Sequence, residues 1–178
     1  MRDVVLYHLM SLDAVAFEDD EWFVDEGPQL VGYLGRVIGT QDDVLLGRGT
    51  YDYWAGHWPK SDFQPFADFI NGTPKHVFAS RPFTPEWANT SVVTAPAGEH
   101  VAELKRRPGG DIGVHGSMEL ARSLLADGLV DKLRLVVSPA TVGRGRRVFD
   151  GGALGSWRLE EMARAANGTL FLDYERAV

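Results

Sequence analysis

Short apolar segments alternate with segments of helical periodicity along most of this chain. Apolar runs of strand length occur at residues 4–10, 43–46, 75–80, 90–94, 111–114 and 130–138. Helical patterns occur between them at residues 26–38, 47–54, 65–71, 96–107 and 117–126. Strands that alternate with helices are typical of a parallel sheet, because each helix carries the chain back across the sheet. The alternation therefore predicts an α/β fold, with a mostly parallel sheet and helices on both of its faces.

The last part of the chain departs from this alternation. Residues 156–165 and 169–176 both have the composition of strands, and Asn167-Gly168 lies between them. Asn-Gly is typical of the tight turn of a β-hairpin, because both residues tolerate the backbone conformation that the turn requires. We therefore expect an antiparallel hairpin at one edge of the sheet.

Size, charge and residue usage limit the class of protein. A length of 178 residues with 44% hydrophobic residues suits one domain, so we expect residues 1–178 to form a single unit. The net charge of −7 argues against a general nucleic-acid binder. The chain has no cysteine, and its five histidines lack the spacing of metal ligands, so we expect no disulfide and no metal site. No signal peptide or membrane-spanning run is apparent, which suggests a cytoplasmic protein with no membrane partner.

Three predicted strands end in residues that suit an anion. These ends carry Arg48-Gly49-Thr50, Ser80-Arg81 and His115-Gly116-Ser117. The first N–H groups of a helix have no partner within the helix, and the helix dipole favours an anion there. Parallel strands end at one edge of a sheet, so three such sites could serve one dinucleotide. Each segment alone also fits a simpler interpretation, as a serine-capped turn or a surface cation.

Other patterns in the chain favour no further chemistry. The first predicted strand is not followed by the Gly-x-Gly-x-x-Gly of a Rossmann fold, and Gly143-Arg144-Gly145 precedes no clear helix. The loop that holds Arg144, Arg146 and Arg147 could contact phosphate or RNA, but such a loop is usually a solvated surface. No serine has the strand–turn–helix context of a hydrolase nucleophile.

Four segments in a fixed order resemble the dihydrofolate reductase superfamily. They are residues 45–51, 78–81, 114–120 and 128–135, and Pro139 and Gly143-Arg144-Gly145 follow them. The similarity is greater to the branch that contains the reductase domain of bacterial riboflavin biosynthesis. Ser11-Leu12-Asp13 also resembles the Ser-x-Asp-Gly of that branch, with Ala14 in place of the glycine. The resemblance implies a mixed sheet of about eight strands with flanking helices.

The resemblance also implies NADPH as the hydride donor. It assigns cofactor-binding residues to all three strand ends: Gly47, Arg48, Gly49 and Thr50 at the first, Ser80 and Arg81 at the second, and Val114, His115, Gly116, Ser117, Met118 and Leu120 at the third. Ser80 and Arg81 would hold the adenosine ribose phosphate, which a guanidinium binds well. The family joins two adjacent glycines at the third turn by a cis peptide bond. Because His115 takes the place of the first glycine, we expect the cis bond between His115 and Gly116.

The substrate side is less defined by the sequence. The resemblance makes Asp13 the expected catalytic and substrate-facing residue, with a local Asx-turn as the alternative. Three aromatic residues could stack on a flat heterocycle or pack in the core: Trp22, Tyr51 and Trp54. Dihydrofolate reductase has an acid on its first helix that meets the pterin, but residues 29–33 hold no acid here. The sequence therefore argues against folate as the substrate.

Two functions fit these observations. The first is an NADPH-dependent oxidoreductase that transfers hydride to a small heterocyclic substrate, which resembles a pterin, a pyrimidine or a flavin precursor. The alternative is a catalytically weak or inactive nucleotide-binding protein of the same fold that serves as a sensor or scaffold, which Ala14 and the missing helix acid favour. Nucleic-acid binding through residues 144–147 is a third and weaker interpretation. The strand with Leu133, Leu135 and Val137, together with the hairpin, suggests the surface of a homodimer.

Overall fold

The computed structural model describes residues 1–16, 22–23, 27–151 and 154–177. In these residues the strands are β1 (Val4–Ser11), β2 (Gln41–Gly47), β3 (Lys75–Phe78), β4 (Thr90–Val93), β5 (Asp111–Val114), β6 (Lys132–Ser138), β7 (Trp157–Arg164) and β8 (Leu170–Arg176). The helices are α1 (Pro28–Ile38), α2 (Arg48–His57), α3 (Phe66–Gly72), α4 (Ala97–Arg106) and α5 (Met118–Ala126), with a short 3-10 helix at Trp58–Lys60. Each predicted strand and helix is present, most with ends shifted by a few residues.

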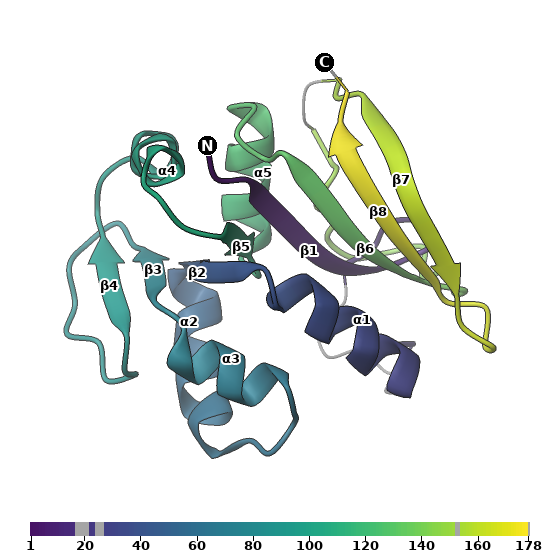
Figure 1. Ribbon diagram of the computed structural model, residues 1–178, viewed down its shortest axis with the longest axis horizontal. Coiled ribbons are helices and arrows are strands. Elements are labelled where there is room, and N and C mark those ends of the chain that lie inside the picture. The colour runs from purple at the N-terminus through teal and green to yellow at the C-terminus, as the bar shows by residue number, and fades with distance from the viewer. Residues whose placement is uncertain (17–21, 24–26, 152–153, 178) are drawn as a thin grey trace.

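The eight strands form one sheet in the order β4-β3-β2-β5-β1-β6-β8-β7 (Figure 1). The pairs from β4 to β6 are all parallel, whereas β8 pairs antiparallel with both β6 and β7. The turn between β7 and β8 contains Asn167-Gly168, and Gly168 has a φ of +93°. The structure therefore confirms the predicted fold class, including the antiparallel hairpin at one edge.

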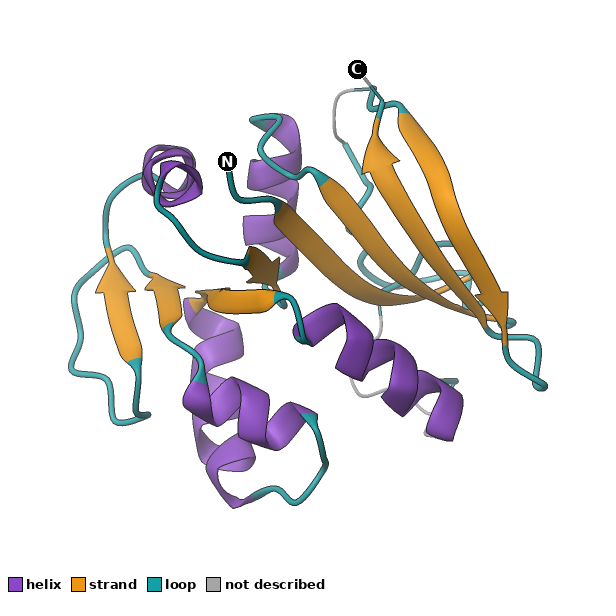
Figure 2. Cartoon of the chain, viewed as in Figure 1, coloured by secondary structure: helices purple, strands orange, loops and turns teal. Residues whose placement is uncertain are grey.

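Helices cover both faces of the sheet because side chains alternate along each strand. Val4 and Leu6 of β1 pack in a core cluster with Val101 of α4 and Leu124 of α5. Val5, between them, packs on the opposite face with residues of α1. Helices α1, α2 and α3 lie on this second side (Figure 2). In the described part of the chain, none of the helices has the length and apolar character needed to cross a membrane.

The side chains of the central strand β1 are less buried in its second half. Val4, Val5 and Leu6 are buried, and so is Ser11 at the end of the strand, but the side chains from Tyr7 to Met10 are half-buried. The pairing of β5 with β1 ends where Val114 lies opposite Leu6, whereas β6 pairs with β1 as far as Ser11. On the β5 side, the second half of β1 therefore borders the turn after β5. This half of β1 lies at the carboxyl edge of the sheet, where α/β proteins bind ligands.

Candidate functional site

The turns after β2 and β5 contact each other directly. The backbone N–H of Gly47 donates a hydrogen bond to the carbonyl of Gly116 over 3.0 Å. A Cβ on Gly47 would overlap Ser117 Oγ, and a Cβ on Gly116 would lie 2.9 Å from Thr50 Oγ1. Only glycine allows the two turns to approach this closely. The contact brings together the first turns of α2 and α5, and thus two of the three predicted anion sites.

The amino terminus of α2 is the more open of the two helix starts. Its N-cap is Gly47, which provides no side-chain hydrogen bond, and the first turn holds no acidic residue. Arg48 and Gly49 are exposed there, with open space around Gly49. At α5, by contrast, Ser117 Oγ accepts the N–H of Leu120 at 3.4 Å. The first N–H groups of α2 are therefore better placed to bind an external anion.

The cis peptide bond of the third turn joins Gly116 to Ser117, so the predicted position between His115 and Gly116 is wrong by one residue. Gly116 has a φ of +142°, a conformation that favours glycine. His115 instead directs its side chain back along β5. Of the two residues that the cis peptide bond joins, Gly116 is therefore the first and Ser117 is the second. Ser117 also caps α5.

His115 lies against α3, and side chains of β1, β2 and α3 hold it. Its Nε2 lies 2.7 Å from Gln41 Oε1 in the space over Gly113, which has no side chain to fill it. Its ring contacts three aromatic rings: those of Tyr7, Phe66 and Phe69. Burial lowers the pKa of His115 to about 4, so the imidazole is neutral at pH 7. Because a carboxamide oxygen only accepts hydrogen bonds, Nε2 carries the hydrogen in this arrangement.

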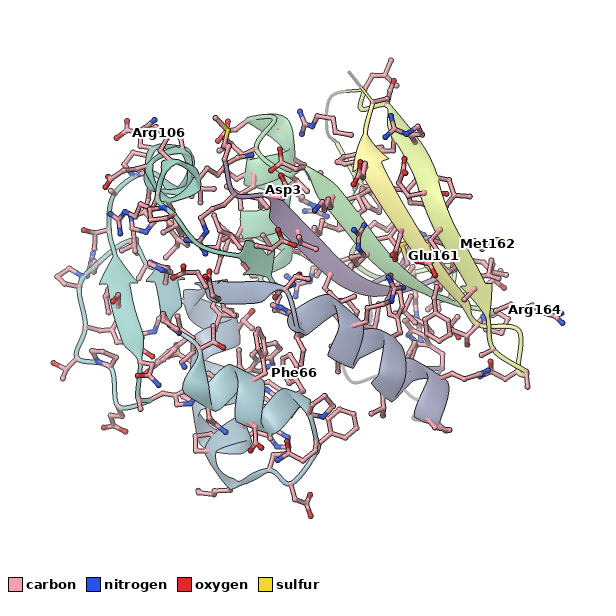
Figure 3. All side chains as sticks on the ribbon, viewed as in Figure 1. Asp3, Phe66, Arg106, Glu161, Met162 and Arg164 are labelled. Carbon is pink, nitrogen blue, oxygen red and sulfur yellow. The ribbon has the colours of Figure 1, made fainter. Side chains whose placement is uncertain are left out.

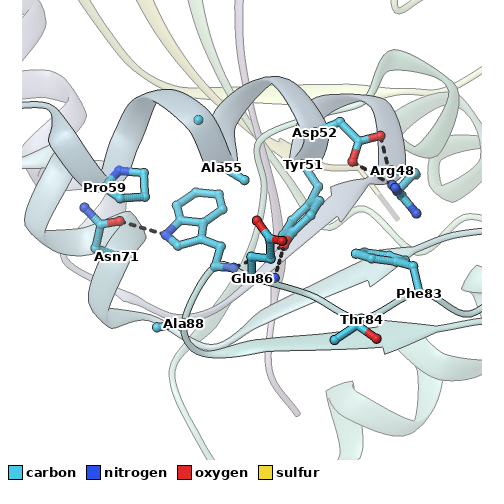
Figure 4. Close-up of a pocket in the computed structure, with 12 residues that line it drawn as sticks. Arg48, Tyr51, Asp52, Ala55, Pro59, Asn71, Phe83, Thr84, Glu86 and Ala88 are labelled. Carbon is cyan, nitrogen blue, oxygen red and sulfur yellow. Dashed lines mark hydrogen bonds and ion pairs between the residues drawn. The ribbon is translucent and has the colours of Figure 1, made fainter.

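Arg48 joins the start of α2 to the segment that follows β3. Its Nε donates to Asp52 Oδ1 at 2.7 Å and Oδ2 at 2.9 Å, and its guanidinium carbon lies 3.7 Å from the centre of the Phe83 ring. Figure 4 shows this arrangement at one end of a pocket of about 950 Å³. Phe83 follows Ser80 and Arg81, which are both exposed. The first and second predicted anion sites are therefore neighbours at the edge of the sheet.

The remaining residues assigned to the cofactor lie beneath the third turn. Val114, Met118 and Leu120 are buried in the core cluster between the sheet and the helices α4 and α5. Their side chains pack in the core on the inner side of the turn. The expected contact of Val114, Met118 and Leu120 with the cofactor stays a prediction.

Asp13 is bound on both carboxylate oxygens. Oδ1 accepts from Ser11 Oγ at 2.7 Å and from the N–H of Val142 at 3.0 Å, and Oδ2 accepts from the N–H of Gly143 at 2.7 Å. Arg147 Nη2 lies 3.4 Å from Oδ2. The hydrogen bonds from Ser11, Val142 and Gly143 hold the pKa of Asp13 well below its usual range. These hydrogen bonds favour the ionised carboxylate and give Asp13 a structural role at the end of β1, while its expected catalytic role stays a prediction. Asp13 clamps the 142–147 segment to the end of β1.

Two of the three aromatic residues expected to meet a substrate pack against the protein instead. Tyr51 is buried, and its hydroxyl accepts the N–H groups of Glu86 and Trp87. Trp54 meets other aromatic rings edge-on, those of Trp58 and Phe66. Core packing, the alternative stated above, therefore describes both side chains. Trp22 contacts the ring of Phe23, but its neighbours at 17–21 and 24–26 lie outside the described residues.

The sequence analysis missed Tyr7, which lies in the half-buried second half of β1. Its ring centre is 6.3 Å from that of Tyr33 on α1 and 5.8 Å from that of His115. Burial raises the pKa of the Tyr7 phenol, so it remains protonated at neutral pH. The signal was present in the sequence, because Tyr7 and His8 interrupt a run of aliphatic residues in β1. No group of three or more potential metal ligands occurs among the residues that the structure describes.

Comparisons with known proteins agree with this architecture. A model of the family described as RibD C-terminal domain matches residues 2–171. A Bacillus subtilis (strain 168) protein, described only as uncharacterized protein YyaP, is 30% identical over 138 residues, which cover 74% of this chain and 70% of that protein.

Solved structures of reductases have the same fold. A Thermotoga maritima diaminohydroxyphosphoribosylaminopyrimidine deaminase/5-amino-6-(5-phosphoribosylamino)uracil reductase has a TM-score of 0.70 and 14% identity, over 99% of this chain and 57% of that one. Dihydrofolate reductase from Enterococcus faecalis, complexed with NADP(H), has a TM-score of 0.67 and 14% identity, over 99% of this chain and 97% of that one. At this identity the likeness shows the fold alone, and it agrees with the resemblance inferred from the sequence.

Proposed function

Because the chain belongs to the RibD C-terminal domain family, we propose that it is a reductase that uses NADPH to reduce a small heterocyclic substrate. The substrate class we propose is pterin-like, pyrimidine-like or related to a flavin precursor. The observation that carries the proposal is the contact between the turns after β2 and β5, which gathers two helix starts at one edge of the sheet. A dinucleotide with several phosphates requires such a concentration of N–H donors and cations.

The residues at this edge fit NADPH. The uncapped start of α2 offers N–H groups to a phosphate, Arg48 supplies an exposed guanidinium over Phe83, and Arg81, two residues before Phe83, supplies a second exposed guanidinium. Ser80 adds a hydroxyl beside Arg81. NADPH supplies the hydride when it is bound, and the chain has to hold it beside a substrate in the right orientation.

The substrate side of the proposal rests on the half-buried second half of β1. Tyr7 and Tyr33 provide aromatic surface there, and the protonated phenol of Tyr7 can donate a hydrogen bond to a ring nitrogen or carbonyl. The Asp13 clamp holds the 142–147 segment against the end of this strand. In this proposal Asp13 shapes the site.

Titration with NADPH and NADH, followed by thermal unfolding, tests the cofactor part of the proposal. We expect NADPH to bind more tightly and to stabilise the protein by about 2.7 kcal/mol at a hundred times its dissociation constant. Absence of a shift with either nucleotide would overturn the proposal. Reduction is tested by following NADPH oxidation with a panel of pterins and aminopyrimidines. Binding of NADPH without oxidation by any member of the panel would contradict the proposed substrate class.

A further inference from the structure

His8 places an imidazole ring in an otherwise apolar part of the sheet. Side chains alternate along a strand, so His8 projects from β1 on the same side as Leu6 and Met10. Leu6 belongs to the core cluster beneath α4 and α5, and Met10 packs against it. Leu135 of β6, which lies opposite His8 in the register, is a buried member of the same cluster. The neighbours of His8 along β1 and across β6 are therefore apolar.

The imidazole of His8 lacks a hydrogen bond at Nε2. This atom is buried, and none of the residues that the structure describes offers it a hydrogen-bond partner. Burial lowers the pKa of His8 to about 4, so the ring is neutral at pH 7. A buried polar atom without a partner costs stability, and most buried polar atoms in proteins are paired. A protein can carry such an atom where a bound ligand supplies the missing partner.

The position of His8 in the sheet indicates which ligand can supply this partner. The pairing of β5 with β1 ends where Val114 lies opposite Leu6. Two residues further along the two segments are Gly116 and His8, so a continued register places the imidazole level with the turn after β5. Gly116 has no side chain that could contact the ring. On the β5 side, the neighbour of His8 is therefore the turn at which the proposed function places NADPH.

The other side of the sheet belongs to the proposed substrate region. Tyr7 projects there and packs against the core clusters that contain residues of α1, α2 and α3. Phe66 of α3 lies on the same side, where its ring contacts His115 (Figure 3). His8 and Tyr7 thus point to opposite sides of β1. A ligand that reaches His8 from the turn after β5 is the cofactor.

We propose that His8 Nε2 forms a hydrogen bond with the carboxamide of the nicotinamide ring when NADPH is bound. This inference rests on the proposed function. A neutral imidazole suits an uncharged amide, whereas a phosphate calls for a cation or for the N–H groups of a helix start. The carboxamide has a carbonyl that accepts and an NH₂ group that donates, so it can pair with either tautomer of the ring. His8 then fixes the orientation of the hydride donor from the side opposite to Tyr7.

Binding measurements with two ligands test this inference. We expect His8→Leu to weaken the binding of NADPH about tenfold, which is the effect of one lost hydrogen bond. The binding of 2′-phospho-ADP-ribose, which keeps the phosphates of NADPH but lacks the nicotinamide, should stay unchanged. Because Leu removes the unpartnered nitrogen, the unliganded variant should resist heat at least as well as the unmodified protein. His8→Gln offers an amide in place of the ring nitrogen and should recover most of the affinity for NADPH.

His57→Leu is the matched control. His57 is exposed at the end of α2, where its ring contacts Trp58, and its replacement should leave both affinities unchanged. An equal loss of affinity for both ligands in His8→Leu would indicate a structural role and refute the inference, and so would an unchanged affinity for NADPH. If the unmodified protein bound neither ligand, the proposed function would fail and this inference with it.

Nuclear magnetic resonance of the unmodified protein gives a readout that does not depend on the folding of His8→Leu. With isotope-labelled histidine, the Nε2 signal of His8 is the one that disappears in His8→Gln. This signal should move when NADPH is added and should stay in place with 2′-phospho-ADP-ribose. A signal that moved equally with both ligands, or with neither, would contradict the contact with the carboxamide.

Discussion

The carbonyl oxygen of Gly116 accepts the N–H of Gly47, and this hydrogen bond joins two turns that are far apart in the sequence. Neither residue contributes a side chain, so the arrangement depends on the absence of Cβ atoms at both positions. This relationship links the fold to the proposed function, because the same turns begin α2 and α5. It also makes the glycines the most direct place to test the proposed cofactor site.

Gly47→Ala should weaken both the fold and nucleotide binding. The added Cβ would overlap Ser117 Oγ and lie 3.0 Å from Ser117 Cβ, so the turns must separate. We expect a loss of about 1–3 kcal/mol in the free energy of unfolding, as for other overpacked sites, and at least a tenfold loss of NADPH affinity. Gly32→Ala on α1 is the control, because no atom lies within 4 Å of the added Cβ and the residue is outside both turns. A Gly47→Ala protein with unchanged NADPH affinity would contradict the proposed site.

Arg81→Ala should reduce the preference for NADPH over NADH. The two cofactors differ by one phosphate on the adenosine ribose, and Arg81 is the exposed cation that we assign to it. Dissociation constants for both nucleotides, measured at two salt concentrations, check this. We expect NADPH binding to fall and NADH binding to change little. An unchanged ratio of the two constants would remove Arg81 from the site.

Asp52→Asn should strengthen the binding of phosphate near Arg48. Both oxygens of Asp52 accept from Arg48 Nε, so the carboxylate occupies one donor of the guanidinium and offsets its charge. Removing the negative charge should tighten NADPH binding roughly threefold to tenfold, with a smaller gain at high salt because exposed charges are screened. Glu103→Gln breaks the i,i+4 pair between Glu103 of α4 and Arg107, the residue after α4, and should leave binding unchanged. Weaker binding by Asp52→Asn would show that Asp52 positions Arg48 for the phosphate.

Asp13→Asn should be less stable than the unmodified protein at neutral pH, and this difference in stability should disappear at acidic pH. Hydrogen bonds lower the pKa of Asp13 in the folded state, so its stabilising effect is present above the pKa of the unfolded chain. That effect is lost as the pH falls through the folded-state pKa. Thermal unfolding of the two proteins should therefore differ at pH 7 and converge at strongly acidic pH. A difference that stayed constant down to that pH would contradict the clamp.

Lys75 should make the stability of the protein depend on alkaline pH. Its Nζ is buried, donates to the carbonyls of Ile70 at 2.8 Å and Thr73 at 2.9 Å, and lies 4.6 Å from the ring centre of Trp87. Burial lowers the pKa of Lys75 from 10.5 to about 8. Between these values the unfolded chain binds more protons than the folded one, so stability should rise with pH over this range. The free energy of unfolding, measured by denaturant at each pH, should not show this rise in Lys75→Met. If it rose equally with pH in both proteins, the lowered pKa of Lys75 would be contradicted.

The sequence predicted the fold well because its signals are local. Helical periodicity, the Asn167-Gly168 turn and the Ser117 cap each act within a few residues, and each appears in the structure. The glycine turns were also recognised as possible anion sites. The predicted position of the cis peptide bond was wrong by one residue. The sequence pattern indicates a tight turn, but it does not show which peptide bond of the turn is cis.

The contacts of Asp13 and His115 could not be predicted from the sequence. Asp13 is bound by Val142, Gly143 and Arg147, and nothing near Asp13 in the sequence indicates these distant partners. His115 followed a strand, but the direction of its side chain depends on Gln41 reaching across Gly113. Such contacts are set by the packing of several elements, which no single segment encodes.

The short β5 divides the carboxyl edge into two regions that can evolve separately. On one side, the turns after β2 and β5 present mainly backbone groups, which most substitutions elsewhere leave intact. On the other, the half of β1 beyond Leu6 presents side chains such as Tyr7 and Leu9. Under the proposed function, a lineage can therefore exchange its substrate by changing a few residues of one strand while keeping its source of reducing power.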